Sequence, residues 1–397
     1  MSYIRTVPEH EGPDAAPMAQ ALALGRGARG RTAPNPWVGC VLVRDGEVVG
    51  AGATEPPGGP HAEAVGLAAA GERARGATAY VTLEPCSHHG RTPPCVDALI
   101  AAGVVRVVVA LEDPDPLVAG AGLAGLRAAG IDVVVGEGAD EAARDLFPYL
   151  VHRRLGRAAA VVKLATSLDG RTAASDGTSQ WITGPRARAD VHRRRAESQA
   201  VVVGSGTALA DRPSLTARDV DPRPVCQPLR VLLDGRGRVP AEGPLFDPSL
   251  APTLVLTTDG APPDAVAAWR RAGAEVHALS PGPAGDGVDL AAALVHLGSR
   301  GVLQALVEPG PTPAGALVDA GLVDRLVLHV GPTLLGVDGR PAFATAGPAT
   351  IADARRWRLV VAESLGDDVS LTYAPRAFGA AEPGAAGAMT PGRPGGV

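Results

Sequence analysis

Short apolar runs alternate with Ala- and Leu-rich stretches along the first half of the chain, and Gly, Pro and Asp lie between them. Valine-rich runs bounded by turn residues predict strands, and Ala-rich stretches predict helices. Alternation of this kind is typical of a layered α/β domain. We expect helices over 18–24, 63–74, 96–103 and 123–130, a hairpin over 39–52 that turns at Asp45 and Gly46, a buried strand over 77–83, another over 104–116 that ends in an acidic loop, and a third over 131–138.

The charged stretch DEAARDLFPYLVHRRLGR, residues 140–157, predicts a helical connector between two domains. A chain of 397 residues exceeds the usual single domain. A second alternation of strands and helices begins directly after the connector, at AAAVVKLATSLDGRTA. The last residues are mostly Gly, Ala and Pro, a composition that favours disorder. We therefore predict a flexible leader over 1–16, a first domain over 17–150, a second over 157–373 and a disordered tail over 374–397.

The composition excludes several classes of protein. Lys and Arg total 37 against 42 Asp and Glu, a net charge of −5, and Phe, Trp and Tyr number four each. A chain without a basic excess and with few aromatic residues is not expected to bind nucleic acid. Four cysteines do not make a disulfide framework in a chain of this length, so Cys40 and Cys226 are expected to pack as small apolar groups. Without a signal-type or membrane-spanning apolar segment, the protein is expected to be soluble and cytoplasmic.

The candidate chemistry is concentrated between His61 and Cys95. His61, Cys86 and Cys95 offer one imidazole and two thiols, and Glu63 lies two residues after the imidazole. One His and two Cys around zinc leave a fourth position for water, as in catalytic rather than structural sites. Zinc lowers the pKa of bound water to about 7. Glu63, which is not a ligand in this reading, would take the proton of that water and deliver it to a departing amine.

Two other interpretations of these residues stay open. A structural zinc site would use His88 or His89 as a fourth protein ligand, and Cys86 and Cys95 would otherwise be buried cysteines without a metal. Neither alternative explains Glu63 or the proline-flanked insert between the cysteines.

The zinc segment carries a family resemblance. It matches the H-x-E and P-C of zinc nucleobase deaminases, but eight residues separate its cysteines where those enzymes have two. The insert SHHGRTPP and the segment NPWVGC resemble the bifunctional riboflavin-biosynthesis enzymes, which join a diaminohydroxyphosphoribosylaminopyrimidine deaminase to a 5-amino-6-(5-phosphoribosylamino)uracil reductase. The resemblance covers roughly residues 17–373. It implies a cytidine-deaminase-like three-layer domain followed by a dihydrofolate-reductase-like α/β domain.

The resemblance also implies site residues. In the first domain His61, Cys86 and Cys95 bind Zn²⁺, Glu63 is catalytic, and Asn35, His88 and Arg91 contact a pyrimidine ribosyl phosphate. From the residues alone, Asn35 has a second interpretation as the cap of its own turn. In the second domain KLATSLDG, SQWITG, GSGTALADRPSLTAR and LVEPGPTPAGALVDAGLVD follow the order of the family's reductase. Residues implied to bind NADPH are Ala165, Trp181, Thr207, Asp211, Gly310, Pro311, Thr312, Pro313, Ala314, Gly315 and Ala316, and those implied to bind substrate are Ser179, Arg195, Leu215, Arg218 and Glu308.

The residues of the second domain support only part of this assignment by themselves. The segment 204–211 predicts a Gly-rich turn after a strand, and 306–322 predicts a strand, a turn and a helix whose N-terminus suits a phosphate. The G-x-G-x-x-G pattern is absent, so NADPH rests on the resemblance. Arg195 and Arg218 are candidates for a phosphate, although the run HRRRAE also fits a solvated basic helix face.

The chain departs from the family pattern at three places. Pro309, Pro311 and Pro313 remove backbone donors from the presumed phosphate loop, and Arg212 stands where an acidic or amide residue is usual. Thr54 lies where the family carries a further His.

Two rival functions are an RNA deaminase and a structural zinc domain joined to a nucleotide-sensing module. The first predicts a basic groove with aromatic residues, which this composition lacks, and the second makes Glu63 dispensable. We expect a small-molecule enzyme that forms a homo-oligomer.

Overall fold

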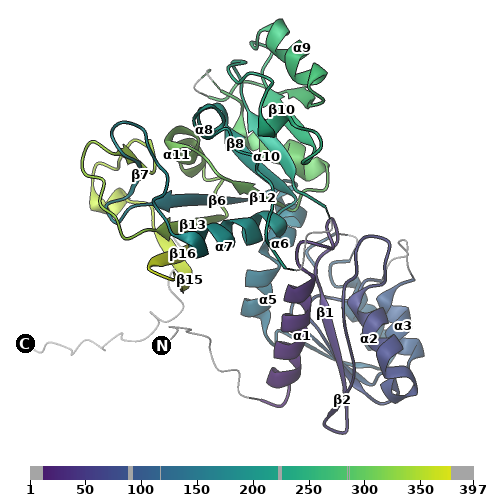
Figure 1. Ribbon diagram of the computed structural model, residues 1–397. Coiled ribbons are helices and arrows are strands. Elements are labelled where there is room, and N and C mark those ends of the chain that lie inside the picture. Colours follow the sequence, from purple (N-terminus) through teal and green to yellow (C-terminus); the bar gives the residue numbers. More distant parts are fainter. Residues whose placement is uncertain are drawn as a thin grey trace, which may run out of the picture.

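The computed structural model describes residues 12–87, 93–116, 118–221, 226–283, 285 and 287–376, which form two lobes (Figure 1). The N-terminal lobe is built from alternating helices and strands, as the apolar pattern predicts. Its elements are α1 (Ala15–Ala28), β1 (Gly39–Arg44), β2 (Glu47–Ala53), α2 (Ala62–Ala70), the 3-10 helix η1 (Gly71–Ala74), β3 (Thr78–Val81), α3 (Cys95–Ala101), β4 (Arg106–Val109), α4 (Ala121–Ala128), β5 (Asp132–Val135) and α5 (Ala139–Asp145).

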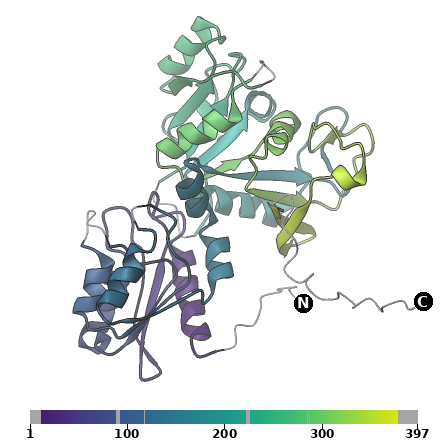
Figure 2. The ribbon, with the colours of Figure 1, turned by 180° about the vertical axis from the view of Figure 1, so that it is seen from behind.

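The five strands of this lobe form one sheet in the order β2-β1-β3-β4-β5, in which β1 is antiparallel to β2 and β3 while β3, β4 and β5 are parallel. Side chains from α2, α3 and α4 pack on one face of the sheet, and those from α1 and α5 pack on the other. The rear view in Figure 2 shows the same layers. The three-layer α/β domain expected from the sequence is therefore confirmed.

In the N-terminal lobe the predicted hairpin turn is present, but the start of the first helix and the burial of the last strand differ from the prediction. Asp45 and Gly46 both have positive φ, 51° and 79°, so they form the predicted hairpin turn. Helix α1 begins before residue 17, and the preceding Asp14 accepts two hydrogen bonds of 2.8 Å from Arg106, so the first domain includes residues assigned to the leader. Strand β5, expected to be buried, is the edge strand of the sheet and is partly exposed.

The C-terminal lobe contains a nine-stranded sheet in the order β11-β10-β9-β8-β12-β6-β13-β16-β15, in which β16 is antiparallel to both β13 and β15 and the other neighbouring strands are parallel. Its elements are α6 (Phe147–Leu155), β6 (Ala159–Thr166), β7 (Arg171–Ala173), α7 (Pro185–Ala196), β8 (Ala200–Gly204), α8 (Ser205–Asp211), β9 (Leu229–Leu233), η2 (Pro244–Phe246), β10 (Thr253–Thr257), α9 (Pro263–Arg271), β11 (Glu275–Ala278), α10 (Leu290–Ser299), β12 (Gln304–Val307), α11 (Pro311–Asp319), β13 (Arg325–Val330), β14 (Arg340–Pro341), η3 (Ile351–Asp353), β15 (Trp357–Leu365) and β16 (Asp368–Pro375).

Apolar residues cover both faces of the large sheet, as expected for parallel strands. Helices α10 and α11 pack on one face, and α6, α9 and η2 contribute to the core on the other. The segment 204–211, expected to be a Gly-rich turn, forms helix α8 instead. Its Thr-Ala-Leu-Ala stretch contains good helix formers, and Ala208 is buried against the sheet.

The predicted connector is packed on both domains. It forms α5 and α6, and Leu146 and Tyr149 belong to the core of the first domain while Phe147 belongs to the core of the second. Leu303, just before β12, is fully buried in the core of the first domain. Cys40 is buried as expected, but Cys226 is exposed, since it lies in a loop rather than in a core. Within the described residues, no helix combines the length and apolar character needed to cross a membrane.

Candidate active sites

The three expected metal ligands converge where two helices begin. His61 is the N-cap residue of α2, Cys95 is the first residue of α3, and Cys86 follows β3. The Nδ1 atom of His61 lies 3.6 Å from the Sγ atom of Cys86 and 3.4 Å from that of Cys95. All three ligand atoms lie within 4.8 Å of one another. The structure therefore brings together the three side chains that the sequence analysis grouped as metal ligands.

The geometry of the cluster fits zinc. In a tetrahedral site, Zn–N distances of about 2.0–2.1 Å and Zn–S distances of about 2.3 Å put nitrogen and sulfur roughly 3.6 Å apart. The hydrogen bond between the two thiols lowers the pKa of Cys86 below its ordinary value, which favours the thiolate form that binds a metal ion. The backbone N–H of Cys95 also points at the Cys86 sulfur, at 3.4 Å. Among the described residues no fourth ligand joins the cluster, and His88 and His89, the proposed fourth ligands of a structural site, lie outside them.

Glu63 lies in the first turn of α2, beside the cluster, and its side chain is buried. Burial raises the pKa of Glu63 to about 7. A carboxyl group with a pKa near neutrality can both take and return a proton, which suits general acid–base chemistry.

Of the other residues discussed for the deaminase site, the structure describes Asn35 and Thr54 but not His88 and Arg91. Asn35 is half-buried, its N–H donates to the Thr32 carbonyl at 2.9 Å, and the Thr32 hydroxyl donates to the Asn35 carbonyl at 3.0 Å. Thr32 therefore stabilises this turn, and the Asn35 side chain does not cap it. Thr54 is buried and its hydroxyl accepts from the Val38 N–H at 3.1 Å, a structural role. His88 and Arg91 lie outside the described residues.

A cleft of about 1460 Å³ opens at the carboxyl ends of β6, β8, β9 and β12 in the second domain. This is the edge at which open α/β sheets bind ligands. The volume exceeds the roughly 300–1,000 Å³ of a single small-molecule site, so a cofactor and a substrate fit together. The expected residues that line it are Ala165, Ser179, Trp181, Arg195, Thr207, Asp211, Leu215, Arg218, Glu308, Gly310, Pro311, Thr312, Pro313 and Ala316.

Two expected cofactor residues do not line the cleft. Ala314 is fully buried in the core, and a side chain on Gly315 would meet the Ala344 carbonyl. Both lie on the side of α11 that packs against the protein. Pro311 and Pro313 occupy the first turn of α11, where backbone N–H groups have no partner within the helix, so the helix tolerates them. Arg212 does not line the cleft; it ends α8 and lies 3.9 Å from Glu242.

The centre of the cleft holds an ion pair. Arg195 donates two hydrogen bonds of 2.7 Å to the two carboxylate oxygens of Glu308. Burial alone would raise the pKa of Glu308, but the Arg195 guanidinium outweighs it and the pKa lies below its ordinary value. Arg195 is therefore not a solvated helix residue, and its predicted contact with a phosphate stays a prediction.

Arg218 is better suited than Arg195 to bind an anionic group of a ligand. Its guanidinium donates to the Ser214 hydroxyl at 2.6 Å and to the Thr216 hydroxyl at 3.3 Å, and it makes no ion pair among the described residues. Its positive charge is therefore not neutralised at the cleft.

Lys163 was missed from the sequence. It lies on β6, lines the cleft, and burial lowers its pKa to about 8. The nearby carboxylate of Glu308 opposes this shift. The available signal was a lone lysine within the apolar run AAAVVKLAT, because a charge in a buried strand needs a partner or a function.

Comparisons with known proteins agree with these two sites. Residues 13–111 match the model of the cytidine and deoxycytidylate deaminase zinc-binding region, and residues 159–381 match the RibD C-terminal domain. Riboflavin biosynthesis protein RibD of Escherichia coli K12 is 44% identical over 366 residues, which cover 89% of this chain and 97% of that protein. The Mycobacterium tuberculosis RibD is 41% identical over 365 residues, covering 90% of this chain and 96% of that one.

Solved structures give the same result for both domains together. Acinetobacter baumannii RibD matches with a TM-score of 0.81 and 39% identity, covering 92% of this chain and 99% of that one. A Thermotoga maritima diaminohydroxyphosphoribosylaminopyrimidine deaminase/5-amino-6-(5-phosphoribosylamino)uracil reductase matches with a TM-score of 0.79 and 30% identity, with the same coverage. The chain therefore belongs to the RibD family of bifunctional riboflavin-biosynthesis enzymes, in which a zinc-binding deaminase domain precedes a reductase domain.

Proposed function

We propose that the first domain hydrolytically deaminates 2,5-diamino-6-ribosylamino-4(3H)-pyrimidinone 5′-phosphate. The observation that carries this proposal is the buried carboxyl group of Glu63 beside a His, Cys, Cys cluster with zinc geometry. His61, Cys86 and Cys95 would hold a zinc ion, a Lewis acid that would lower the pKa of a water molecule to about 7. Glu63 takes a proton from that water on its carboxylate and returns it to the amine that leaves. Family resemblance assigns the substrate contacts to Asn35, His88 and Arg91.

The second domain, in this proposal, reduces the ribosyl group of the deaminated product to ribityl. NADPH, the reductant of the family, would be held by the cleft residues that follow β8 and β12, such as Thr207 and Gly310, and would supply the hydride for the first carbon of the ribosyl group. The ring oxygen that separates from this carbon needs a proton, and Lys163, with a pKa of about 8, can donate one near neutral pH. Glu308 holds Arg195 in place and keeps lone pairs for the ribose hydroxyl groups. Arg218 is placed to pair with the 5′-phosphate.

A single-pot assay tests both steps. Purified, zinc-loaded protein is given the diaminopyrimidinone substrate and NADPH, and ammonia release and NADPH oxidation are followed together. The proposal expects both signals from the wild type and neither from Glu63→Ala, which should still oxidise NADPH when the deaminated product is supplied directly. Ammonia without NADPH oxidation would contradict the reductase step, and absence of ammonia would favour one of the rival functions.

The homo-oligomer and the cytoplasmic location expected from the sequence stay predictions. Light scattering after gel filtration measures the first, and cell fractionation measures the second.

A further inference from the structure

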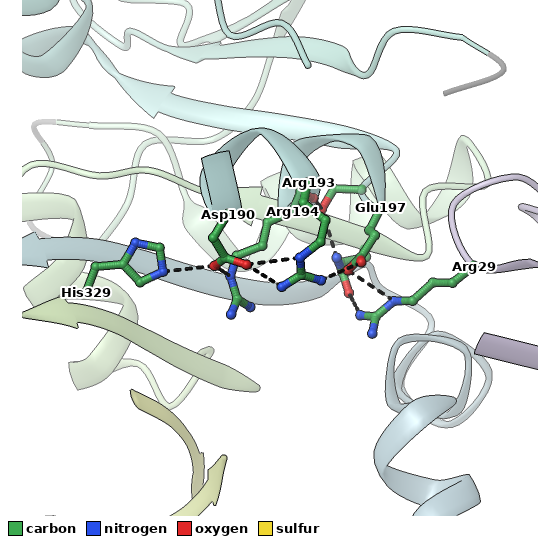
Figure 3. Close-up of polar contacts among 8 residues, drawn as sticks. Arg29, Asp190, Arg193, Arg194, Glu197 and His329 are labelled. Atoms are coloured by element: carbon green, nitrogen blue, oxygen red, sulfur yellow. Dashed lines mark hydrogen bonds and ion pairs between the residues drawn. The ribbon is translucent and has the colours of Figure 1, made fainter. Parts of the chain in front are cut away.

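Arg29 joins the two domains. It follows α1 in the deaminase domain, and its guanidinium lies 5.4 Å from the centre of the Trp37 ring. Its Nη2 atom donates to the side-chain carbonyl of Gln304 at 2.9 Å, and its Nε atom lies 3.7 Å from a carboxylate oxygen of Glu197. Gln304 begins β12, and Glu197, labelled in Figure 3, follows α7, so both partners belong to the reductase domain. One side chain therefore contacts the deaminase core and two reductase elements.

The backbone next to Arg29 also lies against the reductase domain. Gly30 has a φ of 79°, and a Cβ atom there would lie 2.8 Å from the Ala196 carbonyl oxygen. A Cβ atom on Gly301 would lie 3.5 Å from the Cβ atom of Pro34. The segment from Arg29 to Trp37, which we call the interdomain loop, is thus seated on the second domain along much of its length.

The interdomain loop leads directly into the deaminase site. Its Trp37 is buried, and it contains Asn35, the residue that the family resemblance assigns to the pyrimidine. Two residues after the loop, the Gly39 N–H donates at 3.1 Å to the hydroxyl of Thr82, which lies four residues before the zinc ligand Cys86. A displacement of the loop would therefore move Asn35 relative to the metal ligands.

Further hydrogen bonds within the reductase domain hold the two partners of Arg29, Glu197 and Gln304, in place. Arg193 donates to Glu197 at 2.6 Å and also binds Asp190, whose carboxylate accepts from the buried His329 of β13 at 3.0 Å (Figure 3). Gln304 is held separately, because its side-chain amide donates to the Ser198 hydroxyl at 2.8 Å. Arg29 is thus attached to a part of the reductase domain that is anchored in the central sheet.

We propose that Arg29 is a positioning residue for deamination, through which the reductase domain holds the interdomain loop and Asn35 at the deaminase site. The inference rests on the proposed function of the first domain. It predicts that deamination depends on residues of the reductase domain that touch neither zinc nor substrate. It also predicts that this dependence is one-sided, because Glu308 and Thr216 hold Arg195 in the reductase cleft without Arg29.

The test compares Arg29→Ala, Gln304→Ala and the double variant in the full-length, zinc-loaded protein. Because a hydrogen bond to a charged group is stronger than one between neutral groups, loss of this anchor should raise the KM for deamination about fivefold or more. The kcat, the zinc content and NADPH oxidation with the deaminated product should stay within about twofold. The double variant should raise the KM by less than the product of the two single effects, because both changes remove the Arg29–Gln304 hydrogen bond.

Arg26→Ala is the matched control. Arg26 lies one turn earlier on α1 and pairs with Glu141 and Asp145, both within its own domain. This variant should leave the deamination KM unchanged. If Arg29→Ala is poorly folded by thermal denaturation, Arg29→Lys, which keeps the charge but cannot reach both partners in the same way, should show an intermediate KM.

The outcomes separate the inference from the proposed function. Wild-type protein that releases no ammonia would refute the proposed function. Wild-type activity with an unchanged KM in Arg29→Ala, or with equal effects of Arg29→Ala and Arg26→Ala, would refute only the positioning role. Equal losses of kcat and zinc would likewise refute it, because they indicate general damage to the site.

Discussion

The pH dependence of the reductase step should report the ionisation of Lys163. Burial in the cleft lowers the pKa of this lysine from its ordinary value of 10.5 to about 8, and the carboxylate of Glu308 keeps it from falling further. This shift corresponds to about 3 kcal/mol in favour of the neutral amine. The charged ammonium group therefore costs stability below pH 8, and that cost is relieved as the pH rises from about 8 toward 10.5.

The perturbation is a change of pH from 6 to 10 at constant ionic strength, with the deaminated product supplied so that the zinc site does not contribute. If the Lys163 ammonium donates the proton, kcat/KM should be constant below about pH 7, fall to half near pH 8, and then drop about tenfold for each further pH unit. The measurement is initial NADPH oxidation at subsaturating substrate. Lys163→Gln should lose roughly 100-fold in activity and show no ionisation in this range.

The variant Glu308→Gln tests whether the fall in activity is caused by ionisation of Lys163. Removing the carboxylate removes the group that most strongly favours the charged lysine, so the pH at which activity falls should move below 8. A wild-type profile that is flat between pH 7 and 9 would refute the argument. So would a fall at the same pH in wild type and Lys163→Gln, because another group would then be responsible.

Three further predictions concern the zinc site and the fold. Glu63→Gln should retain zinc, measured by metal analysis, and lose roughly 10²- to 10⁴-fold in ammonia release, because the amide cannot carry the proton; full activity would exclude Glu63 as the proton carrier. A zinc chelator should abolish ammonia release but leave NADPH oxidation on the deaminated product, and loss of both would show that the two sites are not independent. Arg230→Met should lower the free energy of unfolding by about 3 kcal/mol in denaturant titrations. The fully buried guanidinium of Arg230 donates to the carbonyls of Pro244, Asp247 and Ala251, which would be left without a donor, so an unchanged midpoint would contradict this account.

The zinc cluster could be predicted from the sequence because its geometry is mostly local. His61 and Glu63 are separated by a single residue at a helix start, and Cys86 and Cys95 lie at element ends that the apolar pattern already indicated. The reductase centre offers no such signal. Lys163, Arg195 and Glu308 come from β6, α7 and the end of β12, and only the order of strands in the sheet brings them together. Periodicity predicts the strands but does not determine which of them are neighbours.

The same limit explains helix α8. Its two glycines favoured a turn when the segment was considered alone. In the structure, Gly204 precedes the helix and Gly206 lies in its first turn, where a glycine costs less helix stability than at the centre, and burial of Ala208 favours the helical form. Local preference did not distinguish a turn from a helix in this segment, and tertiary packing favoured the helix.

The connector, residues 140–157, contributes side chains to both hydrophobic cores, so the boundary inferred from composition is not the boundary between the two cores. Its charges suggested a helical connector at the boundary between two domains, and in the structure Tyr149 is buried in the first core and Phe147 in the second. Leu303, more than 140 residues further along the chain, closes the first core from the reductase side. Full burial of one such side chain contributes about 1.5–3 kcal/mol, a large part of the stability of a small domain. A deaminase domain cut at the connector would expose the surface that Leu303 covers and would lose the partners of Arg29. The reductase domain thus completes the hydrophobic core of the deaminase as well as following it in the chain.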